Sequence, residues 1–475
     1  MNDTKLTNWH LETDDNNICW IHFDTPDTNA NLLSQAAIRE LDEILQALEK
    51  APPQAIVILS DKKDSFIFGA DIKEFTTLEN IELARAFLQN GHNLMNRLDA
   101  MPCPTVSMVH GMCLGGGTEL SLACDYIIAT DHKKTRIGLP EIKLGIFPGY
   151  GGTARSIERC GPLVALNNML TGRALPARAA KKVHLIDEMV PQRQLRAAAE
   201  HYALTAPKRR KLPLLTRLAN TALLRPLVAS QMRKQVAKKA KQQHYPAPYR
   251  LIDLWQKHVG NKKRMLEKEA AAVADLATTD TARNLVRVFF LQEGLKSQGK
   301  QLKFDVEHVH VIGGGIMGGD IASWCAIQGY SVTVQDQSPE RLAQTIKRAQ
   351  YSFKKKFKRD RRAIRDANDR LTADHRGAGI HRADIVIEAI FEDRDVKREL
   401  YQSIERKMKP DAVLATNTSS IKLEELSSCL QDPGRLVGLH FFNPVALMPL
   451  VEIIRGEQTD DDVVRKALAF GKDIG

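Results

Sequence analysis

Two glycine-rich turns, each placed between an apolar strand and a helix, constrain the fold of this chain most strongly. The first is Gly115-Gly116-Gly117-Thr118-Glu119, which follows a strand expected at residues 105–109. The second is Gly313-Gly314-Gly315-Ile316-Met317-Gly318, which follows a strand expected at residues 308–312. Consecutive glycines let the backbone approach a ligand closely and leave N–H groups free to point at it. We therefore expect two α/β domains, each with a ligand site at its glycine turn.

The predicted strands and helices divide the chain into three parts. Strands are expected in the first part at residues 17–24, 55–59, 105–109 and 126–129, and in the last part at residues 308–312, 331–335, 384–388 and 412–415. Residues 163–300 have a mostly helical pattern that several prolines interrupt. A length of 475 residues allows roughly two to four domains. We predict an α/β domain at residues 1–200, a basic helical linker region at 201–305 and a second α/β domain at 306–475.

The cysteine and apolar patterns indicate the class of protein. The seven cysteines form neither a CxxC pair nor a zinc-binding spacing, which favours a reducing compartment and no metal site. The polar, acidic residues 1–15 do not resemble a signal peptide. No apolar run approaches the ~18 residues that a membrane span needs. We therefore predict a soluble, cytoplasmic protein.

Positive charge is concentrated in two segments. Residues 208–269 contain 17 Lys and Arg against 3 Asp and Glu, a balance of +14, whereas residues 1–100 contain 8 against 17, a balance of −9. A second basic run occupies residues 354–359. Such segments are typical of contacts with nucleic acid, an anionic membrane or a phosphorylated cofactor. They are equally consistent with solvated helix faces.

Two glutamates accompany the first glycine turn. Glu119 is expected in the first turn of the helix that follows the glycines, and Glu141 follows Pro140 in a loop. A pair of carboxyl groups, one acting as base and one as acid, can add water across a polarised double bond. A glutamate at a helix start is also explained by the helix dipole alone.

Three segments around these glutamates resemble the enoyl-CoA hydratase (crotonase) family. They are residues 68–72, residues 109–120 and residues 138–149. The resemblance covers roughly residues 8–200. It implies that Ala70 and Gly116 supply the two backbone N–H groups of an oxyanion hole for a thioester oxygen, and that Glu119 and Glu141 are the catalytic carboxyl groups.

The second glycine turn has the features of a dinucleotide-binding fingerprint. Gly313, Gly315 and Gly318 lie between a strand and a helix, and Asp336 ends the next strand 18 residues after the last glycine. In this fingerprint the helix N-terminus binds the pyrophosphate and the acidic residue binds ribose hydroxyls. Because a carboxylate there would repel a 2′-phosphate, we predict NAD rather than NADP as cofactor.

Residues 417–420 and 438–444 resemble the 3-hydroxyacyl-CoA dehydrogenase family. The resemblance implies that His440 takes the proton of the 3-hydroxyl group, that Glu452 orients His440 and that Ser419 binds the substrate hydroxyl. A histidine base beside a carboxylate is what oxidation of a secondary alcohol needs. The residues expected to bind NAD, from the fingerprint and the resemblance together, are Gly313, Gly315, Met317, Gly318, Asp336, Glu392, Lys397 and Asn443.

The order hydratase then dehydrogenase resembles the α subunit of the bacterial fatty-acid β-oxidation complex, in its anaerobic-type form. This resemblance implies hydration of trans-2-enoyl-CoA to (3S)-3-hydroxyacyl-CoA, followed by NAD-dependent oxidation to 3-ketoacyl-CoA. It also implies isomerase and epimerase side activities, and a thiolase β subunit as partner. Because Gly475 lies 35 residues after His440, we expect a C-terminally truncated form that binds NAD but oxidises 3-hydroxyacyl-CoA poorly.

Two other classes of function remain open from the sequence. The first is an RNA-binding protein on a crotonase fold, which the basic segment would support. That segment contains few aromatic residues for base stacking (Tyr245, Tyr249 and Trp255). The second is a non-catalytic scaffold for thiolase. Both glutamates are intact, which favours the enzyme, and no nucleic-acid partner is predicted.

Overall fold

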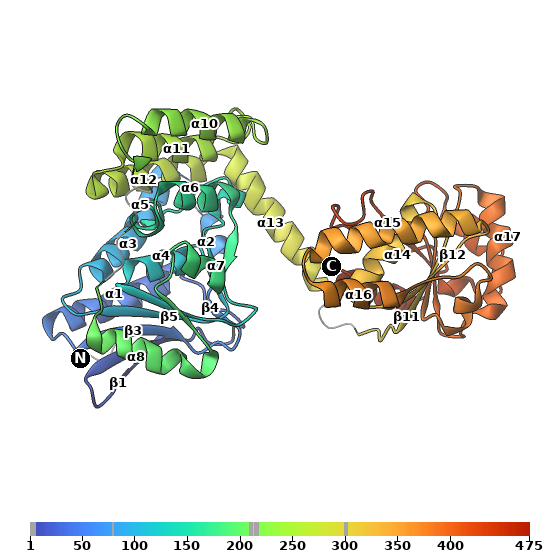
Figure 1. Cartoon of the computed structure of the whole chain (residues 1–475), viewed down its shortest axis with the longest axis horizontal. Coiled ribbons are helices and arrows are strands. Elements are labelled where there is room, and N and C mark those ends of the chain that lie inside the picture. Colours follow the sequence, from blue (N-terminus) through green and yellow to red (C-terminus); the bar gives the residue numbers. More distant parts are fainter. Residues whose placement is uncertain (1–5, 78–79, 209–211, 213–217, 299–302) are drawn as a thin grey trace. The chain divides into compact units, whose positions relative to one another are not determined.

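The computed structural model describes residues 6–77, 80–208, 212, 218–298 and 303–475. The chain divides into two compact units, residues 1–290 and 291–475 (Figure 1). The region at residues 201–305 that the sequence sets apart as a linker therefore divides between these units.

A six-stranded sheet forms the centre of the first unit. In spatial order its strands are β1 (Trp9–Thr13), β2 (Ile18–Phe23), β3 (Ala55–Ser60), β5 (Thr105–Val109), β7 (Tyr126–Thr130) and β10 (Glu188–Val190). Strands β1 and β2 are antiparallel, and all other pairs are parallel. Every residue of β3, β5 and β7 is buried, as expected for parallel strands that helices cover on both faces.

Helices cover both faces of this sheet (Figure 1). One face packs against α8 (Leu195–Thr205), and the other packs against α1 (Gln35–Lys50), α3 (Ile81–Asp99) and α4 (Gly116–Ala123). The Ser34 side chain caps α1 by accepting a hydrogen bond from the Ala37 N–H. The apolar stripe of α1 is buried and consists of Ile38, Leu41, Ile44, Leu45 and Leu48.

A second, smaller sheet lies beside the first glycine turn. Its strands, in spatial order, are β4 (Ser65–Ile67), β6 (Met112–Leu114), β8 (Arg136–Gly138) and β9 (Ala174–Pro176). The remaining helices of this part are α2 (Ile72–Phe75), α5 (Gly152–Cys160), α6 (Pro162–Thr171) and α7 (Ala177–Lys182). Three-residue strands are too short to show an alternating pattern, so sequence periodicity missed them.

The basic helices share the core of the first unit. They are α10 (Arg225–Ala237), α11 (Ala247–His258) and α12 (Lys262–Ala277), followed by α13 (Asp280–Gln298). Trp255 of α11 and Val273 of α12 are completely buried in the same apolar cluster as α1 and α3. Residues 209–211 and 213–217, which belong to the predicted basic segment, lie outside the described residues.

The second unit contains a seven-stranded sheet. In spatial order its strands are β13 (Leu371–Ala373), β12 (Ser331–Gln335), β11 (His308–Ile312), β14 (Ile385–Glu388), β15 (Val413–Thr416), β16 (Leu436–Phe441) and β17 (Val451–Ile454). The first six are parallel, and β17 is antiparallel to β16. Counted along the chain, the parallel strands have the order 3-2-1-4-5-6 of a dinucleotide-binding fold.

Helices surround this second sheet. They are α14 (Ile316–Gln328), α15 (Pro339–Phe357), α16 (Arg361–Arg370), α17 (Arg394–Ile404), α18 (Leu423–Ser427) and α19 (Asp461–Asp473). The sheet order reverses between β11 and β14, and ligands bind at the carboxyl ends of strands at such a switch point. Among the described residues of both units, no helix has the length and apolarity needed to cross a membrane.

Candidate active sites

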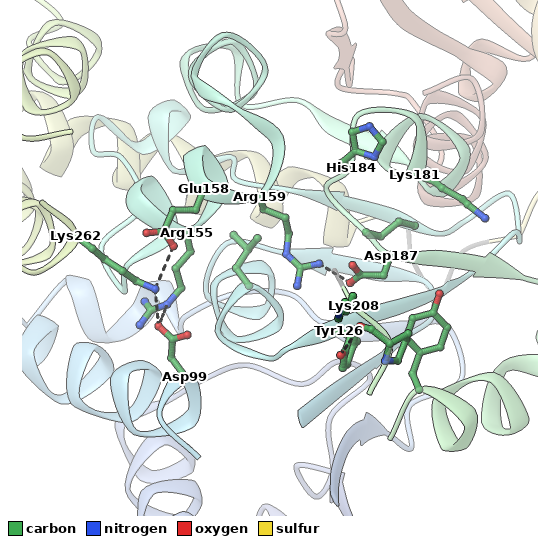
Figure 2. A pocket seen from close by; sticks show the side chains of 14 residues that line it. Asp99, Tyr126, Arg155, Glu158, Arg159, Lys181, His184, Asp187, Lys208 and Lys262 are labelled. Atoms are coloured by element: carbon green, nitrogen blue, oxygen red, sulfur yellow. Dashed lines mark hydrogen bonds and ion pairs between the residues drawn. The ribbon is translucent and has the colours of Figure 1, made fainter. Parts of the chain in front are cut away.

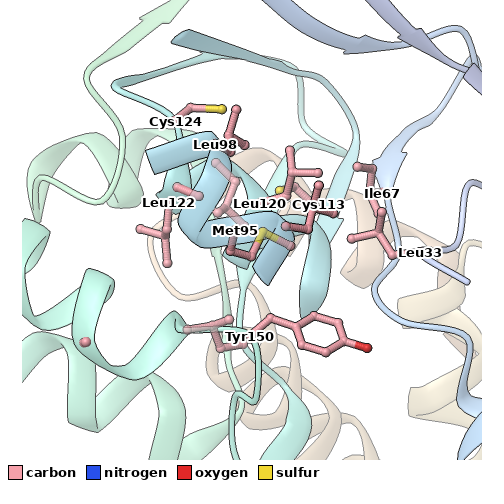
Figure 3. Close-up of a cluster of buried hydrophobic side chains, with 14 of the residues drawn as sticks. Leu33, Ile67, Met95, Leu98, Cys113, Leu120, Leu122, Cys124 and Tyr150 are labelled. Atoms are coloured by element: carbon pink, nitrogen blue, oxygen red, sulfur yellow. The ribbon is translucent and has the colours of Figure 1, made fainter. Parts of the chain in front are cut away.

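The first glycine turn places Glu119 inside the protein. Strand β6 ends at Leu114, and α4 begins at Gly116 after Gly115, whose φ of +51° favours glycine. A Cβ on Gly117 would lie 2.6 Å from Ile67 Cβ, so the helix reaches this depth only with glycine there. All eight residues of α4 are buried, and Leu120 and Leu122 belong to the apolar cluster of Figure 3. Glu119 is 2% exposed.

The backbone around Tyr150 holds the Glu119 carboxylate. Glu119 Oε1 accepts hydrogen bonds from the N–H groups of Tyr150 (2.7 Å) and Gly152 (2.8 Å). Burial raises the pKa of Glu119 to about 7, although these two hydrogen bonds favour its charged form. Glu119 is therefore close to half-ionised at neutral pH, which suits a group that takes up and returns protons.

Glu141 lies on the other side of the same glycine turn. It begins the 3-10 turn Glu141–Leu144 directly after Pro140. A Cβ on Gly115 would lie 3.2 Å from Glu141 Oε1, and both carboxyl oxygens are buried without a hydrogen-bond partner among the described residues. Burial and the nearby charge of Glu119 raise the pKa of Glu141 well above its usual range. Both effects favour the protonated form of Glu141.

The predicted oxyanion donors line the same cavity as both glutamates. A Cβ on Gly116 would lie 3.4 Å from the Ala70 amide nitrogen, so the two amides are close together. Gly116 begins α4, where a backbone N–H has no acceptor within the helix. A cavity of about 70 Å³ is lined by Ala70, Gly116, Glu119 and Glu141, with mainly apolar remaining walls. The arrangement can polarise a carbonyl oxygen and move a proton on either side of it.

Sequence reasoning missed two parts of this site. Tyr150 and Gly152 supply the N–H groups that hold Glu119, and the glycines after residue 148 were the available signal for such a turn. Glu269 of α12 is fully buried beside this turn, where burial and the charge of Glu119 raise its pKa to about 8. A lone glutamate in a basic helical segment gave no signal in the sequence.

A larger polar cavity of about 310 Å³ lies elsewhere in the first unit (Figure 2). Several of its charged groups pair with one another. Asp99 pairs with Arg155 (3.2 Å) and Lys262 (2.8 Å), and Arg159 pairs with Asp187 (2.6 Å). These internal ion pairs give the cavity a structural explanation, and none of the predicted site residues lines it.

One group of side chains has metal-ligand character. His10, His22 and Asp61 lie within 4.8 Å of one another at the edge of the first sheet. His22 Nδ1 is 2.9 Å from Asp61 Oδ1, and the two imidazole rings are stacked with their centroids 4.4 Å apart. Stacked rings direct their nitrogen lone pairs along parallel planes instead of toward one point, so hydrogen bonding explains the group better than a metal site.

The second glycine turn has the close approaches that a dinucleotide cradle needs. Gly313 has a φ of +109°, and its N–H donates to the Gln335 carbonyl (2.8 Å). A Cβ on Gly318 would lie 2.0 Å from the Gly313 carbonyl oxygen, so a side chain there cannot be accommodated without a shift. Gly315 precedes α14, and a Cβ on it would meet no atom within 4 Å. The space in front of Gly315 and the helix N-terminus is thus open to a ligand.

Asp336 directly follows β12 beside this turn. Its carboxylate accepts hydrogen bonds from the N–H groups of Gly314 (2.8 Å) and Ser338 (2.9 Å), and Arg341 Nη1 lies 3.4 Å away. Asp336 lines a cavity of about 500 Å³ with Gly313, Gly315 and Met317, as predicted for a nucleotide site. The open glycine cradle and the fixed carboxylate fit the pyrophosphate and ribose of NAD.

His440, Glu452 and Ser419 form a hydrogen-bonded series. His440 of β16 pairs directly with Glu452 of β17 in the sheet register, and its Nδ1 lies 2.8 Å from Glu452 Oε2. The other ring nitrogen, Nε2, lies 3.3 Å from Ser419 Oγ. The structure thus brings together three residues that are 33 positions apart at most. A histidine oriented by a carboxylate on one side can accept a proton on the other.

Three other predicted NAD-binding residues lie outside the nucleotide cavity. Lys397 is buried and pairs with Glu388 (2.6 Å) and Glu392 (3.4 Å). Glu392 Oε1 accepts hydrogen bonds from the Thr418 hydroxyl (2.6 Å) and the Ser419 N–H (2.8 Å), so it holds the loop that carries Ser419. Asn443 is exposed after β16. Glu392, paired with Lys397, thus supports the loop that carries Ser419, and none of the three residues lines the cavity.

Known proteins match both units. Residues 13–249 match the family model described as enoyl-CoA hydratase/isomerase, and residues 308–475 match that of the 3-hydroxyacyl-CoA dehydrogenase, NAD binding domain. The fatty acid oxidation complex subunit alpha of Aliivibrio fischeri is 35% identical over 488 residues, which cover 100% of this chain and 70% of that protein. The protein of the same name from Shewanella amazonensis is 35% identical over 481 residues, covering 98% and 68%. Because the similarity extends over more than two thirds of these relatives, the chain belongs to the family of fatty acid oxidation complex alpha subunits.

Proposed function

We propose that the first unit hydrates trans-2-enoyl-CoA to (3S)-3-hydroxyacyl-CoA as a step of fatty-acid β-oxidation. The observation that carries this proposal is one cavity lined by two glutamates with buried carboxyl groups and by the residues Ala70 and Gly116, whose amides are the proposed donors. Membership of the alpha-subunit family and the hydratase/isomerase match agree with it. The same pair of carboxyl groups can return a proton at a different carbon, which supports isomerase activity as well.

The donors around each glutamate assign the roles in hydration. Glu119, whose charged form accepts hydrogen bonds from two N–H groups, takes a proton from water as the water oxygen adds to C3. Glu141, whose carboxyl oxygens have no hydrogen-bond partner among the described residues and whose pKa is raised, gives a proton to C2. The N–H groups of Ala70 and Gly116 stabilise the negative charge that develops on the thioester oxygen. Each preorganised donor of this kind is worth roughly 3–4 kcal/mol.

We propose that the second unit binds NAD and carries the base for oxidation of the 3-hydroxyl group of the hydration product, a reaction that the complete protein performs. NAD supplies the hydride acceptor when it is bound, and the turn Gly313–Gly318 with Asp336 would hold it. His440 Nε2 would take the hydroxyl proton, while Glu452 keeps the imidazole oriented through Nδ1. Ser419 would hydrogen-bond the substrate hydroxyl from the same side of the imidazole.

Further partners are proposals of their own. A thiolase β subunit would consume the 3-ketoacyl-CoA product, and the name of the relatives supports assembly into a complex. The exposed lysines at the end of α15 and on α10 support attraction of anionic acyl-CoA or of an anionic membrane surface. Among the described residues no specific observation favours RNA binding. The intact glutamate site favours the enzyme instead.

One assay tests the central proposal. The absorbance of the conjugated thioester should fall when the protein is mixed with crotonyl-CoA, and again with a longer enoyl-CoA. Binding of NAD, measured separately by fluorescence titration, reports on the second unit. A folded protein that leaves both enoyl-CoA substrates unchanged would contradict the hydratase assignment.

A further inference from the structure

A third buried carboxyl group lies beside the proposed hydratase site. Glu269 on α12 is 0% exposed, and in the chain it is 128 residues beyond Glu141. The match to the hydratase/isomerase family model ends at residue 249, so Glu269 lies outside the matched region. A fully buried carboxyl group that belongs to neither proposed reaction needs an explanation of its own.

Glu269 binds the same backbone segment that holds Glu119. Its Oε1 accepts a hydrogen bond from the Gly151 N–H (2.5 Å). Its Oε2 accepts hydrogen bonds from both the N–H (3.1 Å) and the hydroxyl group of Thr153. The two N–H groups that hold Glu119 belong to Tyr150 and Gly152. Four consecutive N–H groups, at the start of α5, are therefore divided alternately between two carboxyl groups.

This segment has little room to move independently of its partners. Gly151 has a φ of +97°, and a Cβ on it would lie 1.8 Å from Arg155 Nη1. The Tyr150 carbonyl accepts a hydrogen bond from the same Arg155 nitrogen (3.2 Å). A Cβ on Gly152 would lie 2.8 Å from Glu119 Oε1. A displacement on the Glu269 side is thus transmitted directly to the Glu119 side.

The other neighbour of Glu269 does not neutralise it. His92 Nε2 lies 3.4 Å from Glu269 Oε1. Burial and the positive charge of Arg155 lower the pKa of His92 to about 4, so this imidazole is neutral near pH 7. The donors of Gly151 and Thr153 are consequently the main groups that satisfy Glu269.

We propose that Glu269 is a positioning residue for Glu119, acting through the shared segment Tyr150–Thr153. The proposal rests on the hydratase function proposed above. Glu269 fixes the start of α5, and the N–H groups of Tyr150 and Gly152 then set the place of the Glu119 carboxylate. Helix α12 also supplies Val273 to the wall of the cavity. The basic helical region is therefore part of the hydratase machinery.

The substitution Glu269→Gln tests this role, with Glu267→Gln as its matched control. Glutamine replaces one carboxyl oxygen of Glu269 by an NH₂ group, so a donor then faces an N–H group of the segment Tyr150–Thr153. We expect kcat for crotonyl-CoA to fall about ten- to a hundredfold, as for a misplaced catalytic group. KM should stay within about twofold, because Glu269 does not line the cavity. Glu267 is exposed on the same helix, and its substitution should leave both constants unchanged.

A double-mutant cycle distinguishes positioning from a loss of folded protein. If Glu269 acts through Glu119, then Glu269→Gln added to Glu119→Gln should lower kcat further by less than about twofold. If Glu269 only stabilises the fold, its effect should multiply fully in both backgrounds, and that outcome would overturn the proposal. Inactive wild-type protein would instead contradict the hydratase function itself.

A milder variant keeps the proposal testable if Glu269→Gln does not fold. Thr153→Val preserves the shape and the N–H of residue 153 but removes the hydroxyl that donates to Glu269. We expect kcat to fall about threefold, again with little further loss in the Glu119→Gln background. Unchanged kcat in well-folded Thr153→Val and Glu269→Gln proteins would show that the segment does not need Glu269.

Discussion

The two sites of this chain use carboxyl groups in opposite ways. In the first unit, burial raises the pKa of Glu119 to about 7, and burial together with the charge of Glu119 raises the pKa of Glu141. In the second unit, burial would also raise the pKa of Glu392, but hydrogen bonds from Thr418 and Ser419 and the charge of Lys397 lower it to about 2. One site keeps its carboxyl groups able to exchange protons near neutral pH, whereas the other fixes a permanent negative charge.

This difference follows from what each reaction requires. Hydration needs one group that releases a proton and another that accepts one, so both must titrate near the working pH. In the dehydrogenase site a histidine is available for the proton, and the carboxylates Glu392 and Glu452 orient other groups by accepting their hydrogen bonds. Burial and the donors around a carboxyl group together separate the two roles, because Glu119 is 2% exposed whereas the Glu392 side chain is 38% exposed and accepts more hydrogen bonds.

The largest effect is expected for the proton-exchanging pair. Glu119→Gln and Glu141→Gln should each lower kcat for crotonyl-CoA hydration by at least ~100-fold, the loss of a positioned acid or base. NAD affinity should be unaffected in both variants, which gives an internal control for the second unit. Near-normal hydration by either folded variant would show that its carboxyl group does not exchange protons in the reaction, and the contrast with the second site would be lost.

A smaller effect is expected at the nucleotide cradle. Gly315→Ala introduces a Cβ that meets no atom of the protein, so thermal stability should be unchanged. The same Cβ projects into the space proposed for the pyrophosphate, and overpacking costs about 1–3 kcal/mol. NAD affinity, measured by fluorescence titration, should therefore fall roughly ten- to a hundredfold. Tight NAD binding by this variant would place the pyrophosphate elsewhere.

The smallest effect concerns surface charge around the first unit. Lys238 and Lys239 are exposed at the end of α10, in the basic segment. Replacing both with glutamine should raise KM for crotonyl-CoA about twofold at low salt, and the difference should vanish at high salt because the charges are screened. Lys50 and Lys63, exposed outside the segment, provide a control with the same change in charge. Equal KM values for the two double variants would show that the lysines at the end of α10 are merely solvated and do not attract acyl-CoA.

Much of the fold was predictable because its signals are local. The strand at residues 308–312 and its glycine turn indicated the dinucleotide-binding fold, and the observed strand order confirms it. The paired glutamates could be placed because both lie within a few residues of glycines or proline that fix the local backbone. The resemblances to the hydratase and dehydrogenase families are confirmed by the matches at residues 13–249 and 308–475.

The remaining features depend on contacts between distant parts of the chain. Glu269 reaches Gly151 across 118 positions, and no periodicity or motif in α12 could indicate that contact. Lys397 has the sequence position of a nucleotide-site residue, yet its ion pair with Glu388 is completely buried. In both cases the partner of the charge is decided by tertiary packing, which local patterns do not contain.

The pH dependence of kcat/KM for crotonyl-CoA hydration tests the contrast between the two sites most directly, because it reports the ionisation of the free enzyme. With Glu119 as base, activity should rise with pH through the Glu119 pKa of about 7, and it should fall at higher pH as Glu141 loses its proton. NAD affinity should show no carboxyl titration of Glu392 above about pH 4, since its pKa lies near 2. A hydration rate that is already constant between about pH 5 and pH 7, as for a carboxyl group of ordinary pKa, would contradict the account.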